Sequence, residues 1–304
     1  QMQFIAYKDK REYALGRNFS CDIHHYLDEW TIGDKHQYAF KPIEASDVVF
    51  VTYASSNHFT EARKGVRSMR AVFENKIIFY DLGLKPEQVK ELEAVCNLEV
   101  RKLQFKKYPV FVTYLNGYNF KPIIMAEVFS ELEHFWIIDA SIRFFDLEPS
   151  LYDFYANVTS GIMETIVLRR PSFHSIFATT HPKMYEYLPV DIPFAKTLDM
   201  LSATMFIARS DFSREAVKWN VLCALTEDCM APNGGRLPCA FAKDRYNFYA
   251  NCHRYDQSSM NIIVTSLLER DGWSRRDRVN DDSMSGFSSV ERGDVDKNPL
   301  VIPC

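Results

Sequence analysis

The stretch Phe135-Trp136-Ile137-Ile138-Asp139-Ala140-Ser141-Ile142-Arg143-Phe144 decides the fold of this chain. It begins as an apolar run typical of a buried strand and stops abruptly at the carboxylate of Asp139. In open α/β sheets, ligands bind in the crevice outside the carboxyl ends of the strands. The stretch therefore predicts an acidic side chain where a bound cation or ribose would lie. An ordinary alternative is that Asp139 caps a helix or pairs with Arg143.

Strand and helix patterns alternate before this stretch. Each of three apolar strands is followed by a helical pattern, and the next strand begins where the helix ends. Such alternation predicts an α/β fold with a mainly parallel, Rossmann-like sheet. The predicted strands are 47–53, 76–80, 98–103 and the one ending at Asp139, and the predicted helices begin at His58, Pro86 and 118–122.

The end of the first strand is the place for a nucleotide. No Gly-x-Gly-x-x-Gly fingerprint and no Walker A loop follows it, which disfavours a dinucleotide cofactor or an ATPase. A nucleotide can still lie at the edge formed by Thr52, Tyr53 and Ala54, and Tyr53 is the stacking candidate for a base. Trp136 lies inside an apolar strand, so we expect it to pack in the core.

The second half of the chain is less regular. We expect a strand or short helix over 161–168, a helix over 181–187 and a strand over 200–208. Two further helices are predicted over 213–225 and 258–270. The charged, serine-rich tail over 274–298 reads as loop.

Composition narrows the class of protein. The 304 residues are 47% hydrophobic and 25% charged, which is ordinary for a globular protein with a large core. The net charge of -4 argues against a nucleic-acid partner. No apolar stretch approaches the roughly 20 residues of a membrane-spanning helix. The chain begins Gln1-Met2-Gln3, so we expect any membrane attachment to use an anchor absent from this fragment.

Seven cysteines raise the question of zinc or disulfides. The local spacings do not fit the Cys-x2-4-Cys pairs of zinc sites. Disulfides suit a secreted or Golgi-luminal chain, and the sequons at Asn18 and Asn157 point the same way. We therefore predict disulfides in the secretory pathway, with at least one thiol unpaired within the chain. The clustered cysteines are Cys223, Cys229, Cys239 and Cys252.

Three segments together resemble the GT-A glycosyltransferases. Lys121-Pro122 and a helix precede the strand that delivers Asp139-Ala140-Ser141, like the Asp-x-Asp signature of those enzymes. The segment 202–207 resembles their acceptor-side strand, and 252–261 resembles the Asp-Gln-x-x-x-Asn segment beside the donor sugar. The pattern is most similar to a largely uncharacterised group of animal, nematode-rich, type II Golgi proteins. The resemblance covers roughly residues 47 to 270.

This resemblance implies one continuous catalytic domain in two halves. Residues 1–46 lack clear periodicity and are expected to form an ordered N-terminal extension or stem remnant, which would precede a nucleotide-sugar-binding half over 47–145. The half over 146–304 would be the acceptor side and carry the cysteine-rich loop. The implied activity is transfer of a hexose or N-acetylhexosamine from a UDP-sugar to a glycan or glycoprotein.

The resemblance also implies two alternative ways of binding the diphosphate, through Mn²⁺ or through side-chain cations. Mn²⁺ would be held by Asp139, Ser141 and a further group such as His253, yet a serine is a poorer ligand for a hard cation than a carboxylate. Alternatively, side chains neutralise the diphosphate, and the candidates are Lys121, Arg143 and Arg254.

The carboxylate beside the reacting sugar is expected to be Asp256. In an inverting enzyme it would act as general base on the acceptor hydroxyl, whereas in a retaining enzyme Asp256 or Gln257 would steady the transition state. Asp256 can also be read as a helix N-cap, and His253 as a structural hydrogen-bonding residue. A catalytically inactive GT-A-like binding protein is the alternative function. A secreted hydrolase ranks last, because its usual motifs are missing from the sequence.

Overall fold

The computed structural model describes residues 2–145, 150–202, 204–272, 276–281 and 288–292. Within that part of the chain, a central sheet has the strand order β12-β8-β11-β6-β3-β4-β5. Its strands are β3 (Val49–Ala54), β4 (Ile77–Asp81), β5 (Leu98–Lys102), β6 (His134–Ile138), β8 (Ile166–Arg169), β11 (Met205–Ala208) and β12 (Asn280–Asp281).

The prediction of a mainly parallel α/β sheet is confirmed. The strands β5, β4, β3 and β6 run parallel to one another, and β12 runs parallel to β8. Only β11 opposes its two neighbours within this sheet, so the sheet is mixed rather than purely parallel. Each parallel connection in the first half crosses over through a helix, as parallel pairing requires.

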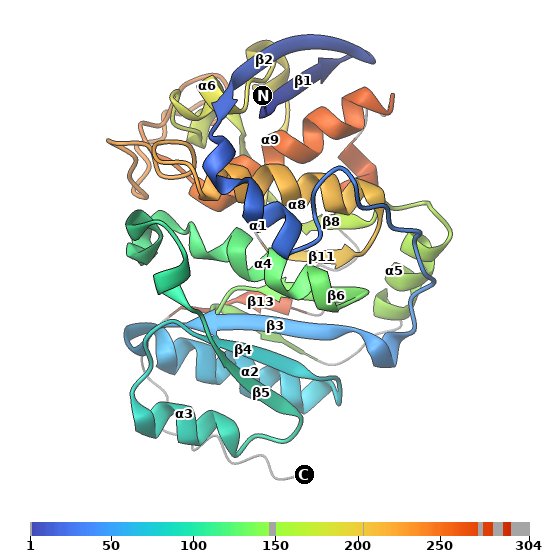
Figure 1. Cartoon of the computed structure of the whole chain (residues 1–304), viewed down its shortest axis with the longest axis vertical. Helices are drawn as coiled ribbons and strands as arrows, with labels where there is room; N and C mark the ends of the chain where they lie inside the picture. Colours follow the sequence, from blue (N-terminus) through green and yellow to red (C-terminus); the bar gives the residue numbers. More distant parts are fainter. Residues whose placement is uncertain (1, 146–149, 203, 273–275, 282–287, 293–304) are drawn as a thin grey trace.

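Helices cover both faces of the sheet. In Figure 1, α8 and α9 lie on one side of β3, while α2 and α3 lie on the other. The crossover helices are α2 (Phe59–Val72), α3 (Pro86–Glu93) and α4 (Phe120–Glu131), and those of the second half include α5 (Ser150–Thr159), α8 (Asp211–Ala224) and α9 (Tyr255–Arg270).

Alternation along β3 builds the two halves of the core. Val49, Val51 and Tyr53 join the cluster that includes α4, α8 and α9. Phe50 belongs to the opposite cluster, which includes α2 and α5. Successive side chains of a strand point to opposite faces, so an all-apolar strand fills both layers. Trp136 is in that second cluster and donates its indole N–H to the Tyr155 hydroxyl at 3.0 Å, which confirms its core position.

The N-terminal segment is a structural part of the domain. The sequence over 1–46 showed no clear periodicity, but β1 (Met2–Lys8) and β2 (Arg11–Phe19) pair as an antiparallel hairpin. Its β1 strand contacts α9, and β2 contacts α6 (Met184–Tyr187). Phe4 is fully buried, with its ring edge-on to Trp219 at a centroid distance of 5.4 Å. The hairpin thus caps the helical layer of the second half (Figure 1).

Two predicted elements of the second half differ in the structure. The single strand expected over 200–208 is two strands, β10 (Asp199–Leu201) and β11. The tail expected to be loop contributes β12 to the main sheet and β13 (Ser288–Val290), which pairs with β7 (Ile142–Phe144). These short pairings depend on distant partners that local pattern cannot reveal. The remaining elements include α1 (His24–Glu29), α7 (Ile192–Ala195) and β9 (Pro171–Ser175).

The prediction of disulfides is confirmed. Cys223 bonds to Cys229 and Cys239 bonds to Cys252, all within the cysteine-rich segment, whereas Cys21 is free and exposed. Disulfides are compatible with a secretory or luminal protein. Among the described residues, no helix combines the length and the apolar character needed to cross a membrane.

Candidate active site

The order of strands creates a ligand crevice beside β3. From β3 the chain moves to β4 and β5 on one side, and α4 then returns it to β6 on the other side. The point where the direction reverses is where open α/β sheets bind ligands, at the carboxyl ends of the strands. Tyr53 and Ala54 end β3, and Asp139 directly follows β6. The predicted edge is therefore also the switch point of this sheet.

One ammonium group joins the two carboxylates that the sequence singled out. Lys121 Nζ lies 2.8 Å from Asp139 Oδ1 and 3.0 Å from Asp256 Oδ2. The Tyr53 hydroxyl also donates to Asp139 Oδ1. Lys121 lies in the first turn of α4, and Asp256 in the first turn of α9. The crossover helix, the strand edge and a helix far along the chain thus meet at one point.

Burial and charge act against each other in this cluster. The Lys121 and Asp256 side chains are 8% and 10% exposed, whereas that of Asp139 is 32% exposed. Burial alone would raise the pKa of Asp139, but the charge and hydrogen bond of Lys121 and the hydrogen bond from Tyr53 together outweigh it, and the pKa lies below its ordinary value. Burial raises the pKa of Asp256, and the nearby charge of Asp139 raises it further against the pull of Lys121. Burial opposes the charge of Lys121, yet the two carboxylates hold its pKa well above the ordinary value.

A first cavity of about 490 Å³ opens at the ends of β3 and β6. That size is typical of small-ligand sites. Ala54 and Leu82 contribute apolar surface to its wall, and Tyr53, Tyr114 and Tyr118 contribute rings. The combination suits a planar base and a sugar, with Asp139 and Ser141 at one end.

A second cavity of about 500 Å³ lies against the same cluster. Lys121, Asp139 and Ser141 line both cavities, whereas Asp256 and Gln257 line only the second. The Lys121 cluster therefore stands between two spaces of similar size. A ligand in one cavity and a ligand in the other would meet at the carboxylates.

Three lining residues of the second cavity have unusual backbone conformations. Tyr118, Arg170 and Tyr255 have φ angles of 56°, 41° and 42°. Residues other than glycine rarely adopt such φ angles. Each such residue costs of order 1–3 kcal/mol and persists only where the surrounding structure enforces it. The rings of Tyr118 and Tyr255 lie 5.4 Å apart, and Lys121 Nζ lies 5.0 Å from the centroid of the Tyr118 ring. Strain of this kind clusters at functional sites, which supports a site here.

Asp256 is not a helix N-cap, which was the alternative role expected for it. The helix α9 begins at Tyr255, with Arg254 at the N-cap position, so Asp256 is inside the first turn. The Gln257 amide donates to Leu201 O at 2.8 Å and to Ser172 Oγ at 3.2 Å. These bonds hold the start of α9 against β10, and leave the Asp256 carboxylate on the cavity side with Lys121.

Two predicted nucleotide-binding residues lie elsewhere. Thr52 is buried and donates its hydroxyl to Ile138 O at 2.9 Å, inside the sheet. Arg143 is buried and donates to the carbonyls of Ala140 and Ile142 at 2.7 and 2.8 Å. Neither lines the two cavities. Both predictions are corrected to structural roles, in which Arg143 supports the turn that carries Ser141.

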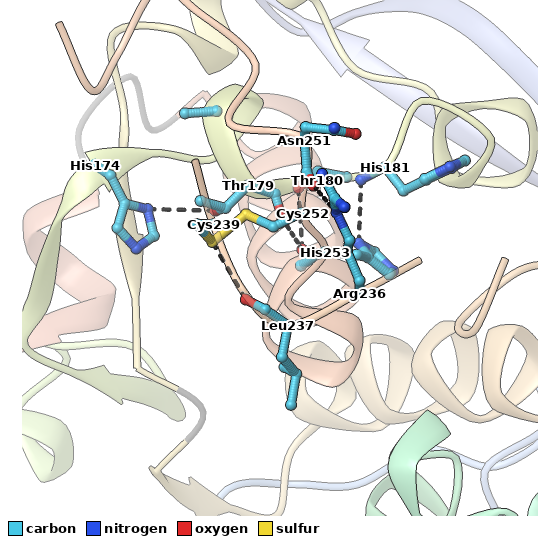
Figure 2. Close-up of a disulfide and its surroundings, with 12 residues drawn as sticks. His174, Thr179, Thr180, His181, Arg236, Leu237, Cys239, Asn251, Cys252 and His253 are labelled. Carbon is cyan, nitrogen blue, oxygen red and sulfur yellow. Dashed lines mark hydrogen bonds between the residues drawn. A yellow bond between two sulfur atoms is a disulfide. The ribbon is translucent and has the colours of Figure 1, made fainter. Parts of the chain in front are cut away.

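His253 is also placed away from the predicted metal site. Its Nδ1 accepts from the His181 backbone N–H at 3.1 Å, and its Nε2 lies 3.0 Å from Met230 O. Burial lowers its pKa to about 3. Figure 2 shows His253 between His181 and the Cys239–Cys252 disulfide. With both ring nitrogens engaged and no place in either cavity lining, His253 pins the loop and does not join Asp139.

The donor set does not fit a divalent cation. Asp139 Oδ1 already accepts from Lys121 and Tyr53, and the second acidic position is Ser141. Within the described ranges, no group of three or more His, Cys, Asp or Glu side chains has the geometry to hold a metal ion. The ammonium of Lys121 stands where a cation bridging the carboxylates would be expected.

Several lining residues escaped the sequence analysis. The second cavity is lined by Arg169, Arg170 and Arg245, and Arg292 lines both cavities. Arg169 and Arg170 at the end of β8 could have been recognised from the sequence as candidate binding residues, because arginines are seldom buried unless they have a partner. Arg245 and Arg292 sit in irregular segments, where sequence pattern gives no position.

The model of a family described as a protein of unknown function, DUF1647, matches residues 2–126. No curated protein sequence matches this chain significantly. The match takes in the hairpin, the first-half strands up to β5 and Lys121, and stops before Asp139.

Two solved glycosyltransferases are among the structures that match. The galactosyltransferase LgtC, in complex with donor and acceptor sugar analogs, has a TM-score of 0.41 at 10% identity, covering 71% of this chain and 70% of LgtC. The bifunctional glycosyltransferase WbbM, in its apo structure, has a TM-score of 0.43 at 12% identity, covering 75% of this chain and 39% of WbbM.

Proposed function

We propose that this protein is a glycosyltransferase that moves a sugar from a UDP-sugar to a glycan or glycoprotein acceptor. The observation that carries the proposal is the position of Lys121 Nζ, bonded to both Asp139 and Asp256 between two adjoining cavities. Transfer between two bound substrates needs two spaces that meet at the reacting groups. The lining of the first cavity suits the donor nucleotide, and the second is then the acceptor space.

On the donor side, the uridine would lie in the first cavity against Tyr53 and Ala54. The diphosphate would extend toward Ser141 and Lys121, where the two cavities join. Negative charge grows on the diphosphate as the sugar leaves, and a fixed ammonium aimed at that charge lowers the barrier. The site residues do not fit Mn²⁺, so side-chain cations carry this role in the proposal.

On the acceptor side, Asp256 is the proposed base. It lines only the second cavity and is held by Lys121, so it faces the space assigned to the acceptor hydroxyl. A carboxylate whose pKa is raised takes up a proton more readily than an ordinary aspartate. The hydrogen bonds of Gln257 fix the helix turn that presents Asp256.

The proposed location is the Golgi lumen, with any membrane attachment through an anchor outside these residues. Two disulfides support an oxidising compartment. Asn18 of the first sequon is exposed on β2, which suits glycosylation.

A UDP-release assay across a panel of UDP-sugars tests the proposal, together with calorimetric titration of UDP. We expect UDP binding and release of UDP from at least one sugar donor, with Asp139→Asn losing at least tenfold in rate. Asp153→Asn, an exposed aspartate on α5, is the matched control and should keep wild-type rates. Absence of both binding and turnover in the wild-type protein would refute the proposal.

The second candidate is a binding protein on the same scaffold without turnover. Ser141 in place of an acid and the capture of Asp139 by Lys121 and Tyr53 favour it. The Asp139→Asn variant separates the two candidates. A pure binder keeps its ligand affinity in that variant and never shows turnover, whereas an enzyme loses rate.

A further inference from the structure

The wall of the second cavity carries far more positive than negative charge. The carboxylates among its described lining residues are those of Asp139 and Asp256, and both are already paired with Lys121. The basic side chains on the same wall are Lys121, Arg169, Arg170, Arg245, Arg254 and Arg292. The arginines therefore face a cavity whose own carboxylates are committed elsewhere.

Arg245 and Arg254 show this excess most directly. Within the described part of the chain, neither guanidinium forms an ion pair or a hydrogen bond with a protein group. Arg245 stacks on the Phe241 ring, with its guanidinium carbon 4.2 Å from the ring centroid. A half-buried guanidinium with five donors and no acceptor is costly unless a ligand or water supplies one.

The basic groups also act on one another. Burial lowers the pKa of Arg254, and the charges of Arg292 and Arg245 lower it further. Burial and, to a smaller extent, the charges of Arg254 and Arg245 lower the pKa of His174 to about 4. Cationic side chains crowded on one wall give that wall a positive potential, which is typical of a site whose partner is an anion.

The loop that carries Arg245 is held in place. The Cys239–Cys252 disulfide closes it, and Figure 2 shows that bond beside His174 and Leu237, which also line the cavity. The Ser175 hydroxyl donates to Tyr246 O at 2.7 Å, next to Arg245. Preorganised donors lose little entropy on binding, so the wall is built to receive a ligand.

We infer that the second cavity recognises an acidic saccharide, whose carboxylate or sulfate group binds to Arg245 and Arg254. The inference rests on the proposed function, because it names the acceptor class for that same site. Both arginines line only the second cavity, whereas the donor diphosphate must lie where the two cavities join, at Lys121 and Arg292. Guanidinium groups bind carboxylates and sulfates through paired, charge-assisted hydrogen bonds that a neutral sugar cannot provide.

Calorimetric titration in the presence of UDP tests this inference. The probes are a hyaluronan tetrasaccharide, which carries uronic carboxylates, a chondroitin 4-sulfate tetrasaccharide, and the carboxyl-reduced neutral form of the first. We expect at least one acidic probe to bind about tenfold or more tighter than the neutral form. Equal affinity for acidic and neutral probes would overturn the inference.

Variants locate the binding and separate it from the donor. Arg245→Gln and Arg254→Gln should each weaken the acidic probe about tenfold and leave UDP affinity unchanged. Lys243→Gln, which removes an exposed charge from the same disulfide-closed loop, should change neither affinity. An equal loss of UDP affinity in the arginine variants would assign them to the diphosphate and overturn the inference. If the wild-type protein binds the acidic probe but not UDP, the acidic site stands and the proposed donor function fails.

Discussion

Replacing Lys121 by Met tests whether one ammonium holds the site together. Met has about the length of the lysine aliphatic stem but lacks the ammonium group that lies between Asp139 and Asp256. Lys121 and Asp256 are each at least nine-tenths buried, and breaking such a pair costs about 3–5 kcal/mol because a carboxylate is left buried and unpaired. Asp139 is a third exposed and keeps part of its hydration, so its share is small. We expect the free energy of unfolding to fall by about 3 kcal/mol at pH 7.

The loss should depend on pH in a defined direction. The folded-state pKa of Asp256 is already raised in the wild-type protein, and without Lys121 it rises further above the unfolded value of about 4. A raised carboxyl pKa makes the fold less stable as pH increases from about 4 toward the new pKa. The destabilisation should therefore be smaller at pH 5 than at pH 8. Lys121 itself does not disturb this window, because its pKa is raised in the wild-type fold and its contribution is complete below about pH 10.

Urea denaturation followed by circular dichroism measures these free energies. Adding Asp256→Asn to the Lys121→Met variant should recover most of the loss, because the unpaired charge is then gone. Lys218→Met is the matched control. Lys218 is a buried lysine on α8 whose partner, Asp34, is 80% exposed, so its removal should cost about 1 kcal/mol or less. A Lys121→Met loss as small as that of the control, or one independent of pH, would refute the reasoning.

Three further results are expected. In a pH-rate profile, the rate of transfer should fall on the acid side at a pH above the ordinary aspartate pKa of about 4, because the pKa of Asp256 is raised. The Asp256→Asn variant should lose this acid-side fall and at least about 100-fold of the rate. UDP affinity should differ less than about twofold between Mn²⁺ and EDTA by calorimetry, and a tenfold loss in EDTA would contradict the misfit of Asp139 and Ser141 to a metal. The paired change Cys239→Ser with Cys252→Ser should lower the free energy of unfolding by about 3 kcal/mol in urea, whereas Cys21→Ser should leave it unchanged.

The sequence was sufficient for what depends on local pattern. Apolar runs and helix starts fixed the strand and helix order of the first half, and the helix opened by Pro86 begins at that residue. The strand ending before Asp139 placed a carboxylate at the sheet edge, and the structure adds that this edge is the switch point between β3 and β6. These features follow from periodicity and from a general rule of α/β sheets.

The errors came from orientation rather than from element type. Thr52 and Tyr53 are neighbours in β3, but the Thr52 hydroxyl is bonded to Ile138 O inside the sheet, whereas Tyr53 and Ala54 at the end of the strand line the crevice. Arg143 lies two residues beyond Ser141, yet its guanidinium folds back onto carbonyls of its own turn. No sequence pattern predicts that Lys121 contacts the carboxylates of both Asp139 and Asp256, because the three residues belong to three separate elements. The hairpin of β1 and β2 was missed for the same reason, since its burial depends on α9 and α6.

Binding of a donor diphosphate needs more positive charge than the Lys121 cluster supplies. One ammonium stands against two carboxylates, so Lys121 needs a further cation beside it to offset the charge of an incoming diphosphate. Arg292 lines both cavities and is exposed, which places a positive charge where they join. We therefore expect Arg292→Gln to weaken UDP about tenfold by calorimetry, and by less at high salt, because an exposed charge is screened. Uridine, which lacks the phosphates, should bind the variant and the wild-type protein equally well. Equal losses for UDP and uridine would show that Arg292 shapes the nucleoside pocket instead, and the balance of charge would then have to come from another group.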